Sequence, residues 1–188
     1  MTPIRHLLAA AACAVLSSAA VAAPELVVTP ASQTVMLGDT VTVDVMSTGF
    51  ADAVVGGGFD FSYDASVLSL TGISFGPEWD PLASSAGTHD AVAGTVTGLF
   101  FNTFTGSPTG SFLNATLSFK AIGLGSSAIT LAANPLFPFA NLAAEEVPFS
   151  VASGTVQAVP EPATVSLLLA GVGVMGWMAR RQRQAQRG

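Results

Sequence analysis

Few side chains in this sequence are suited to acid–base or nucleophilic catalysis. Residues 24–160 contain one histidine, His89, and no cysteine. A Cys–His pair is therefore impossible in this region, and a Ser–His–Asp triad would have to use His89. His89 and Asp90 lie in a stretch rich in Ser, Gly and Thr, which predicts a solvated loop. We expect no catalytic residue, and a protein that is not an enzyme.

One short acidic and aromatic segment, Glu78-Trp79-Asp80, has side chains suited to sugars. Paired carboxylates can act as acid and base on a glycosidic bond, and a tryptophan ring can stack on a sugar. Carboxylates two residues apart on a loop have no fixed separation, however, and Trp79 could equally pack inward. We therefore assign Trp79, Glu78 and Asp80 as candidate ligand contacts, not catalytic groups. Zinc-ligand spacing and calcium-loop motifs are missing from the sequence, so no metal and no cofactor is expected.

Charge is unevenly distributed along the chain. The whole chain carries −6, but residues 24–160 hold eleven acidic side chains and a single basic one, Lys120, which gives this region a net charge of −10. A surface of this sign repels phosphate backbones, so we expect no nucleic-acid partner. Because the region lacks cysteine, its fold must depend on a hydrophobic core and not on disulfides.

Apolar and polar residues alternate in short segments of the middle region. In 40–45 the valines fall on one face, and in 59–64 the aromatic and acidic residues fall on opposite faces. A period of two is typical of antiparallel strands that each cover one side of a core. We therefore predict an all-β sandwich of about nine strands. The candidate strands are 26–29, 33–36, 40–45, 59–64, 67–75, 92–102, 113–120, 127–132 and 147–156.

Two local backbone features follow from the same patterns. In segment 67–75 the apolar alternation shifts phase at Gly72, which predicts a β-bulge. Asp64 follows a strand and precedes Ala65 and Ser66. There its carboxylate can accept the backbone N–H two residues on and close an Asx-turn. We favour this structural role for Asp64 over a ligand contact.

The stretch from Phe59 to Leu68 also resembles a known family. Its Tyr63-Asp64 and Val67-Leu68 pairs are similar to the cohesin pattern apolar-x-apolar-x-Tyr-Asp-Pro-x-Val-Leu, with Ala65 in place of the usual proline. The resemblance extends over most of 26–157, including 94–101 and 112–121. It implies a cohesin-like, nine-stranded jelly-roll β-sandwich over 24–158, related to carbohydrate-binding modules. It also implies a protein partner that bears a dockerin-like module.

The first 22 residues are predicted to be a signal peptide. Arg5 precedes an Ala-rich apolar stretch, and Ala20-Val21-Ala22 supplies the small residues that signal peptidase requires. Cleavage after Ala22 avoids placing Pro24 directly after the cut. We therefore expect the protein to be exported.

The C-terminal segment has three parts in a fixed order. Pro160-Glu161-Pro162 precedes the apolar run 163–179, and a cluster of arginines follows. An apolar run of this length predicts a short transmembrane helix, whose basic end stays in the cytoplasm. The flanking basic residues are Arg180, Arg181 and Arg183.

This arrangement, over 159–183, resembles the PEP-CTERM sorting signal of Gram-negative bacteria. The resemblance implies that an exosortase, an integral-membrane transpeptidase, recognises the Pro-Glu-Pro box and releases the protein from its tail. It also implies an association with extracellular polysaccharide and biofilm matrix. The physical logic is that of a temporary tether.

Together these patterns predict an exported, exosortase-processed extracellular binding or matrix protein with a non-catalytic cohesin-like domain. We expect a transient tether at the inner membrane, then release to the cell surface or the extracellular space. The partners expected are an exosortase and either a dockerin-like protein or exopolysaccharide. The main alternative, a carbohydrate-binding module for exopolysaccharide, predicts that Trp79 or Tyr63 is exposed on a flat face. A hydrolase is the third class, and it ranks below the other two.

Overall fold

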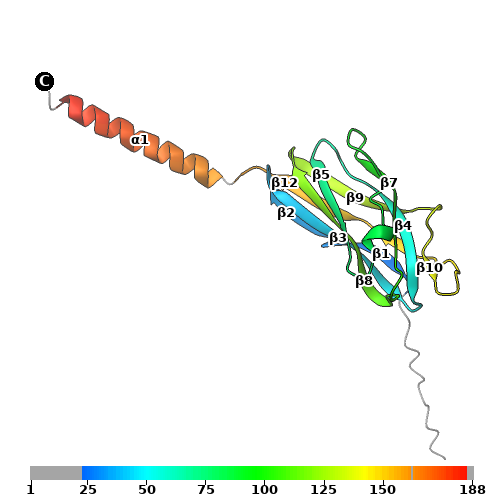
Figure 1. Cartoon of the computed structure of the whole chain (residues 1–188). Helices are drawn as coiled ribbons and strands as arrows, with labels where there is room; N and C mark the ends of the chain where they lie inside the picture. Colours follow the sequence, from blue (N-terminus) through cyan, green and yellow to red (C-terminus); the bar gives the residue numbers. More distant parts are fainter. Residues whose placement is uncertain (1–22, 162, 186–188) are drawn as a thin grey trace, which may run out of the picture.

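The computed structural model describes residues 23–161 and 163–185. The expected signal peptide, 1–22, and Pro162 of the proline–acid–proline segment lie outside the described residues. The strands, between Glu25 and Val159, form a two-layered β-sandwich, and Ala163–Ala185 form a helix, α1 (Figure 1). The all-β prediction for the domain is confirmed.

One layer of the sandwich is a five-stranded sheet. Its strand order is β11-β1-β3-β8-β5. Neighbouring strands are antiparallel except β1 and β11, which pair in parallel. The strands span Glu25–Thr29 (β1), Thr40–Phe50 (β3), Leu68–Phe75 (β5), Gly110–Ala121 (β8) and Ser150–Ala152 (β11).

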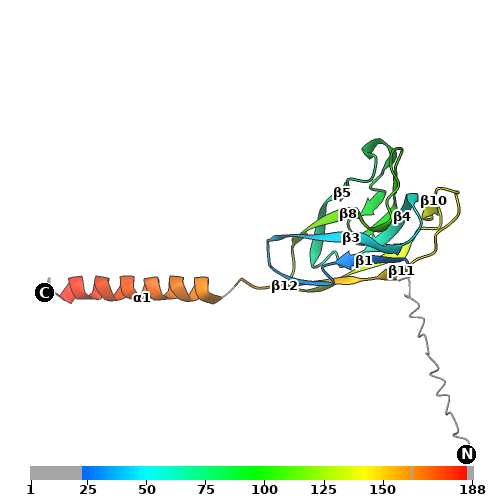
Figure 2. The same ribbon diagram turned by 90° about the horizontal axis from the view of Figure 1, so that it is seen from below.

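The other layer is a seven-stranded sheet. Its order is β2-β12-β9-β4-β7-β6, with β10 beside β4. Only β2 and β12 pair in parallel, and β12 leads out of this layer toward α1 (Figure 2). The strands span Ser32–Met36 (β2), Val54–Ser62 (β4), Thr88–Asp90 (β6), Thr95–Asn102 (β7), Gly125–Ala133 (β9), Ala140–Asn141 (β10) and Gly154–Val159 (β12), and a 3₁₀ turn, η1 (Pro81–Ala83), connects β5 to β6.

Each of the candidate strand segments overlaps a strand in the structure. Segment 147–156 holds all of β11 and the start of β12, because the chain crosses there from one sheet to the other. The loop predicted at His89 and Asp90 is wrong, since both residues lie in β6 and pair with β7. All three side chains of β6 are exposed. The strand therefore has no buried face, and no apolar alternation could mark it in the sequence.

The hydrophobic core lies between the two sheets and is built from the inward-facing residues of each strand. In β3, for example, Val41, Val43 and Val45 are buried while Thr40 and Thr42 are exposed. Fully burying a side chain of Val, Leu or Phe size stabilises a fold by about 1.5–3 kcal/mol. The largest fully buried side chains include Phe50, Phe59, Phe101, Phe119, Phe139, Leu26, Leu68, Leu99, Leu117 and Ile129.

Both predicted backbone features are present. The pairing of β5 with β8 shifts register between Leu70 and Gly72, as a bulge requires. The Asp64 Oδ1 atom accepts the Ser66 backbone N–H at 2.8 Å and the Ser66 hydroxyl at 2.6 Å. Both bonds lower the pKa of Asp64 because they favour the charged carboxylate, and the bond from the hydroxyl has the larger effect. Asp64 therefore closes the turn that leads from β4 toward β5.

The two ends of the sandwich carry different parts of the chain. The chain continues to α1 from the end of the sandwich that contains Val159, the last residue of β12; we call this the proximal end. Leu37 lies there too, and donates its N–H to the Val159 carbonyl oxygen. The antiparallel pairs β12–β9, β9–β4 and β4–β7 place the start of β4 and the end of β7 at the opposite, distal end. Loops 51–53, 76–87, 103–109 and 134–149 gather there.

Candidate functional site

The candidate ligand residues 78–80 lie after β5 at the distal end, but they do not face the same way. Trp79 is only 3% exposed, and its indole N–H donates to the Leu113 carbonyl oxygen at 2.9 Å. Its ring packs against Phe101 with 4.4 Å between centroids. The ring therefore belongs to the core and has no free face for a sugar. This position corrects the assignment of Trp79 as a ligand contact.

Glu78 and Asp80, by contrast, reach the surface. They line a hollow of about 250 Å³ together with Thr103 and Thr105. The Asp80 Oδ1 atom also accepts the Leu82 N–H at 2.8 Å and so caps η1. No three His, Cys, Asp or Glu side chains gather as a metal site within 23–161 and 163–185. The two carboxylates can thus contact a ligand at the surface, whereas Trp79, which also lines this hollow, is too buried to offer its ring as a platform.

The histidine of the domain is paired with the only tyrosine of the chain. The Tyr63 hydroxyl lies 2.7 Å from His89 Nε2, and Tyr63 is 6% exposed. Burial raises the pKa of Tyr63, and the negative charge of Asp90 acts in the same direction. Neither Tyr63 nor Trp79 therefore presents the exposed ring that the carbohydrate-binding alternative predicts.

The sequence from Gly72 to Gly76 has the Gly-x-Ser-x-Gly spacing of a hydrolase nucleophile elbow. In the structure Ser74 lies within β5, opposite Thr116 of β8. It does not stand at a turn between a strand and a helix, as an elbow serine must. The His89 Nε2 atom faces the Tyr63 hydroxyl. The spacing is thus a coincidence of strand sequence.

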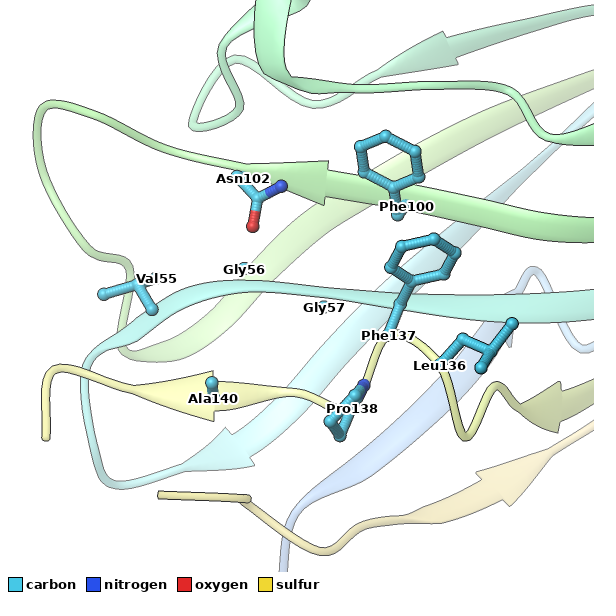
Figure 3. A pocket seen from close by; sticks show the side chains of 9 residues that line it. All are labelled: Val55, Gly56, Gly57, Phe100, Asn102, Leu136, Phe137, Pro138 and Ala140. Atoms are coloured by element: carbon cyan, nitrogen blue, oxygen red, sulfur yellow. The ribbon is translucent and has the colours of Figure 1, made fainter. Parts of the chain in front are cut away.

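A groove crosses the distal part of the seven-stranded sheet, over the start of β4 (Figure 3). Its volume is about 200 Å³. The floor is backbone, because Gly56 and Gly57 have no side chains. One wall comes from β7 and the other from the segment 136–140. Residues from three separate parts of the chain therefore build this hollow.

Stacked aromatic rings span the two walls of the groove. Phe100 of β7 and Phe137 lie 4.6 Å apart between centroids, at 26° to each other (Figure 3). Both rings are half-buried, and neighbouring Leu136 is 80% exposed. This pair joins β7 to the segment 136–140, which is distant from β7 in the sequence.

The glycines of β4 allow this wall to form. A Cβ atom on Gly57 would lie 2.5 Å from the ring of Phe139, and one on Gly58 would lie 2.7 Å from Cβ of Phe137. Any larger residue would push segment 136–140 off the strand. Alternation patterns do not reveal the groove. The three consecutive glycines, Gly56 to Gly58, are the one sequence signal that could have located it.

The proline–acid–proline segment begins where the domain ends. β12 ends at Val159, and Pro160 and Glu161 are both exposed. Each proline fixes its own φ and cannot donate a backbone hydrogen bond. Pro160 and Glu161 are thus an accessible part of the connection that follows the sandwich.

The large apolar side chains described in α1, from Leu167 to Met178, are exposed. The Arg181 guanidinium lies 5.2 Å from the centre of the Trp177 ring. Arg180 is exposed, and Arg183 lies in the last turns of the helix. In the part of the chain that the structure describes, no helix is long and apolar enough to cross a membrane. The expected transmembrane helix is therefore not confirmed.

Comparison with protein families gives two matches. The profile of the PEP-CTERM protein-sorting motif matches residues 158–184, which cover the proline–acid–proline segment and most of α1. The profile of the cohesin domain matches residues 25–158, which include every strand of the sandwich except the last residue of β12. No curated protein matches the chain.

Solved structures with similar folds are cohesins. The seventh ScaB type I cohesin of Pseudobacteroides cellulosolvens superposes with a TM-score of 0.62 at 14% identity, over 74% of this chain and 94% of that chain. A type I cohesin–dockerin complex from Clostridium thermocellum gives 0.62 at 15% identity, over 73% and 100%. A non-cellulosomal cohesin from the archaeon Archaeoglobus fulgidus gives 0.59 at 16% identity, over 77% and 97%. With a family profile that covers its β-sandwich, this chain belongs to the cohesin domain family.

Proposed function

We propose that this protein is exported, sorted through its C-terminal motif and placed outside the cell, where its cohesin domain binds a protein partner without catalysis. The observation that carries the proposal is the cohesin match over 25–158. Because the similar structure from Clostridium thermocellum is a cohesin–dockerin complex, the partner that we propose bears a dockerin-like module. The proposed setting, an exopolysaccharide or biofilm matrix, follows from the sorting motif.

The outer face of the seven-stranded sheet supports binding of a protein better than binding of a small ligand. Along β9 and β12 its exposed side chains are uncharged, and all of them except Gln157 are small. Such side chains lose little rotamer entropy when a partner covers them. Their desolvation also costs less than that of charged groups. The residues are Ser126, Ala128, Thr130, Ala132 and Gln157.

Site-specific photocrosslinking tests the binding proposal. A photoreactive residue replaces Ala128 on β9, and a matched control replaces Thr42, which is exposed on β3 of the other sheet. In native extracellular material we expect one discrete protein adduct from position 128 and none from position 42. Equal adducts at both positions, or adducts with polysaccharide alone, would contradict a protein-binding face on this sheet.

The sorting proposal rests on the motif match and on the exposed Pro160 and Glu161. We propose that an exosortase cuts the chain near Pro160–Pro162. Intact-mass measurement of the secreted protein should then give a species that ends in this segment. Replacing Pro160, Glu161 and Pro162 with alanine should leave the full-length form in the cell envelope. A secreted form that still contains Trp177 would show that no such cut occurs.

A further inference from the structure

The groove over β4 is the centre of a longer surface at the distal end. On one side lies the hollow that contains Glu78 and Asp80. On the other lies a hollow of about 210 Å³ that contains Asp52, Asn141 and Leu142. Thr103, in the first hollow, donates its N–H to the Val55 carbonyl oxygen in the central groove at 3.0 Å, and Asn141 of the third hollow follows Ala140 of the central groove, so the hollows are neighbours. We call these three hollows together the distal groove.

Most side chains that line the centre of the distal groove are apolar, with Asn102 and the glycine backbone adding polar atoms, and large apolar side chains are exposed around it. Leu136 is 80% exposed, Phe104 75%, Leu142 73% and Leu82 96%. Leu136 and Leu142 line the hollows themselves, and Phe104 and Leu82 are next in sequence to residues that do. Soluble domains seldom gather large apolar side chains at this exposure unless something covers them. These side chains mark the distal end as a binding surface.

The flanks of the distal groove are acidic and have no neutralising base. Asp52 lies at one flank, and Glu78 and Asp80 lie at the other. The one basic residue of 24–160, Lys120, pairs in the sheet with Thr40 at the proximal end. The carboxylates of the distal groove therefore attract cationic groups on whatever approaches them.

We infer that the distal groove binds a segment of a protein partner that has a large apolar anchor between basic residues. The anchor fills the apolar centre against the Phe100–Phe137 pair, and Lys or Arg side chains on both sides meet Asp52 and Glu78. A second copy of this chain does not fit as the partner, because two domains that each have a net charge of −10 repel each other. This surface is separate from the exposed rows of β9 and β12, so the inference does not depend on the binding face proposed above.

Binding of synthetic peptides to the full chain, measured by calorimetry, tests the inference. The probe has a central Trp-Leu pair with lysines on both sides. One control peptide replaces the lysines with glutamates, and a second replaces Trp-Leu with Ser-Ser. We expect saturable binding of the probe that weakens as salt rises, since screening shortens from about 10 Å at 0.1 M to about 3 Å at 1 M. Both control peptides should bind at least about tenfold more weakly.

Matched variants locate the binding on the chain. Leu136→Ser in the distal groove should weaken probe binding at least about fivefold, whereas Leu124→Ser, which is 54% exposed at the proximal end, should change it less than about twofold. Asp52→Asn combined with Glu78→Gln should weaken it about fivefold at low salt, and Asp39→Asn at the proximal end should not. These side chains are exposed, so circular dichroism should show unchanged folding.

The outcomes separate this inference from the proposed binding face. Equal binding of the glutamate or serine peptides, or no saturable binding of the probe, would overturn the inference. An equal loss from Leu124→Ser and Leu136→Ser would also overturn it. In either case the adduct at position 128 would remain, because that adduct reports only on β9. Loss of that adduct with intact peptide binding would instead remove only the proposed face.

Discussion

Truncation of Trp79 separates a structural role for this residue from a role in ligand binding. The side chain is 3% exposed, packs against Phe101 at 4.4 Å and donates a hydrogen bond to the Leu113 carbonyl oxygen at 2.9 Å. Trp79→Ala removes all of these contacts and leaves a cavity, which typically costs about 3–5 kcal/mol. For a domain of ordinary stability, about 5–15 kcal/mol, the expected loss is a large part of the total.

The conservative variant Trp79→Phe separates the contribution of the hydrogen bond from that of ring packing. It keeps an aromatic ring beside Phe101 but loses the indole N–H. We expect this variant to lower the free energy of unfolding by about 1–3 kcal/mol, because one hydrogen bond contributes about 0.5–1.5 kcal/mol and the Leu113 carbonyl loses a partner. A double-mutant cycle with Phe101→Leu should give a coupling energy of about 0.5–1.5 kcal/mol for the aromatic pair.

Urea unfolding followed by circular dichroism measures these free energies. Phe104→Ala is the matched control, because Phe104 is 75% exposed in a nearby loop and should cost less than about 0.5 kcal/mol. If Trp79→Ala costs less than about 1 kcal/mol and abolishes binding of a partner or sugar, the ring acts at the surface. That result would refute the assignment of Trp79 to the core.

Four further outcomes are expected. Phe119→Ala, at a fully buried position, should cost about 3–5 kcal/mol in urea unfolding. Gly57→Ala should destabilise the domain by about 1–3 kcal/mol in the same assay, because its new methyl group would overlap the Phe139 ring. The folded-state pKa of Asp64 is lowered, so the stability that it contributes is present above its ordinary value of 3.8 and falls as pH drops below it. Asp64→Asn should therefore reduce the acid-induced loss of stability. The folded-state pKa of Tyr63 is raised, so its contribution is present below its ordinary value of 10.0 and is lost as pH rises through the raised value. Tyr63 is the only tyrosine, so tyrosinate absorbance reports it alone, and a pKa at or below the ordinary value would contradict its burial.

The strands were predictable where one face of a strand is buried. Alternation gave the location of β3 and of β8 because every second side chain enters the core over Val41–Ser47 and Ala115–Ala121, although the phase in β8 shifts at Asn114 and Ala115, which are both buried. β6 has no buried side chain, and so its pairing with β7 left no mark on the sequence. The first half of β4 was missed for another reason. Its run from Gly56 to Gly58 offers no side chains that could alternate.

The candidate site was less predictable, because its parts come together only in the folded chain. The direction of Trp79 depends on a carbonyl group 34 positions away, in β8. The distal groove depends on Phe100 and Phe137 meeting across β4. No local pattern encodes such contacts. The sorting segment is the opposite case, because its order of proline, acid, proline, apolar run and arginines is read along the chain itself.

The position of the C-terminal connection determines how mechanical load would pass through this domain. The chain leaves at the proximal end after β12, whereas the distal groove lies at the other end of the strands. β12 is held by β9 on one side and β2 on the other, with five residue pairs in each ladder. Tension between a tether beyond Val159 and a ligand in the groove would run along these strands. The backbone hydrogen bonds would then be sheared together and not peeled one after another, so the force needed to open the domain would be set by both ladders at once.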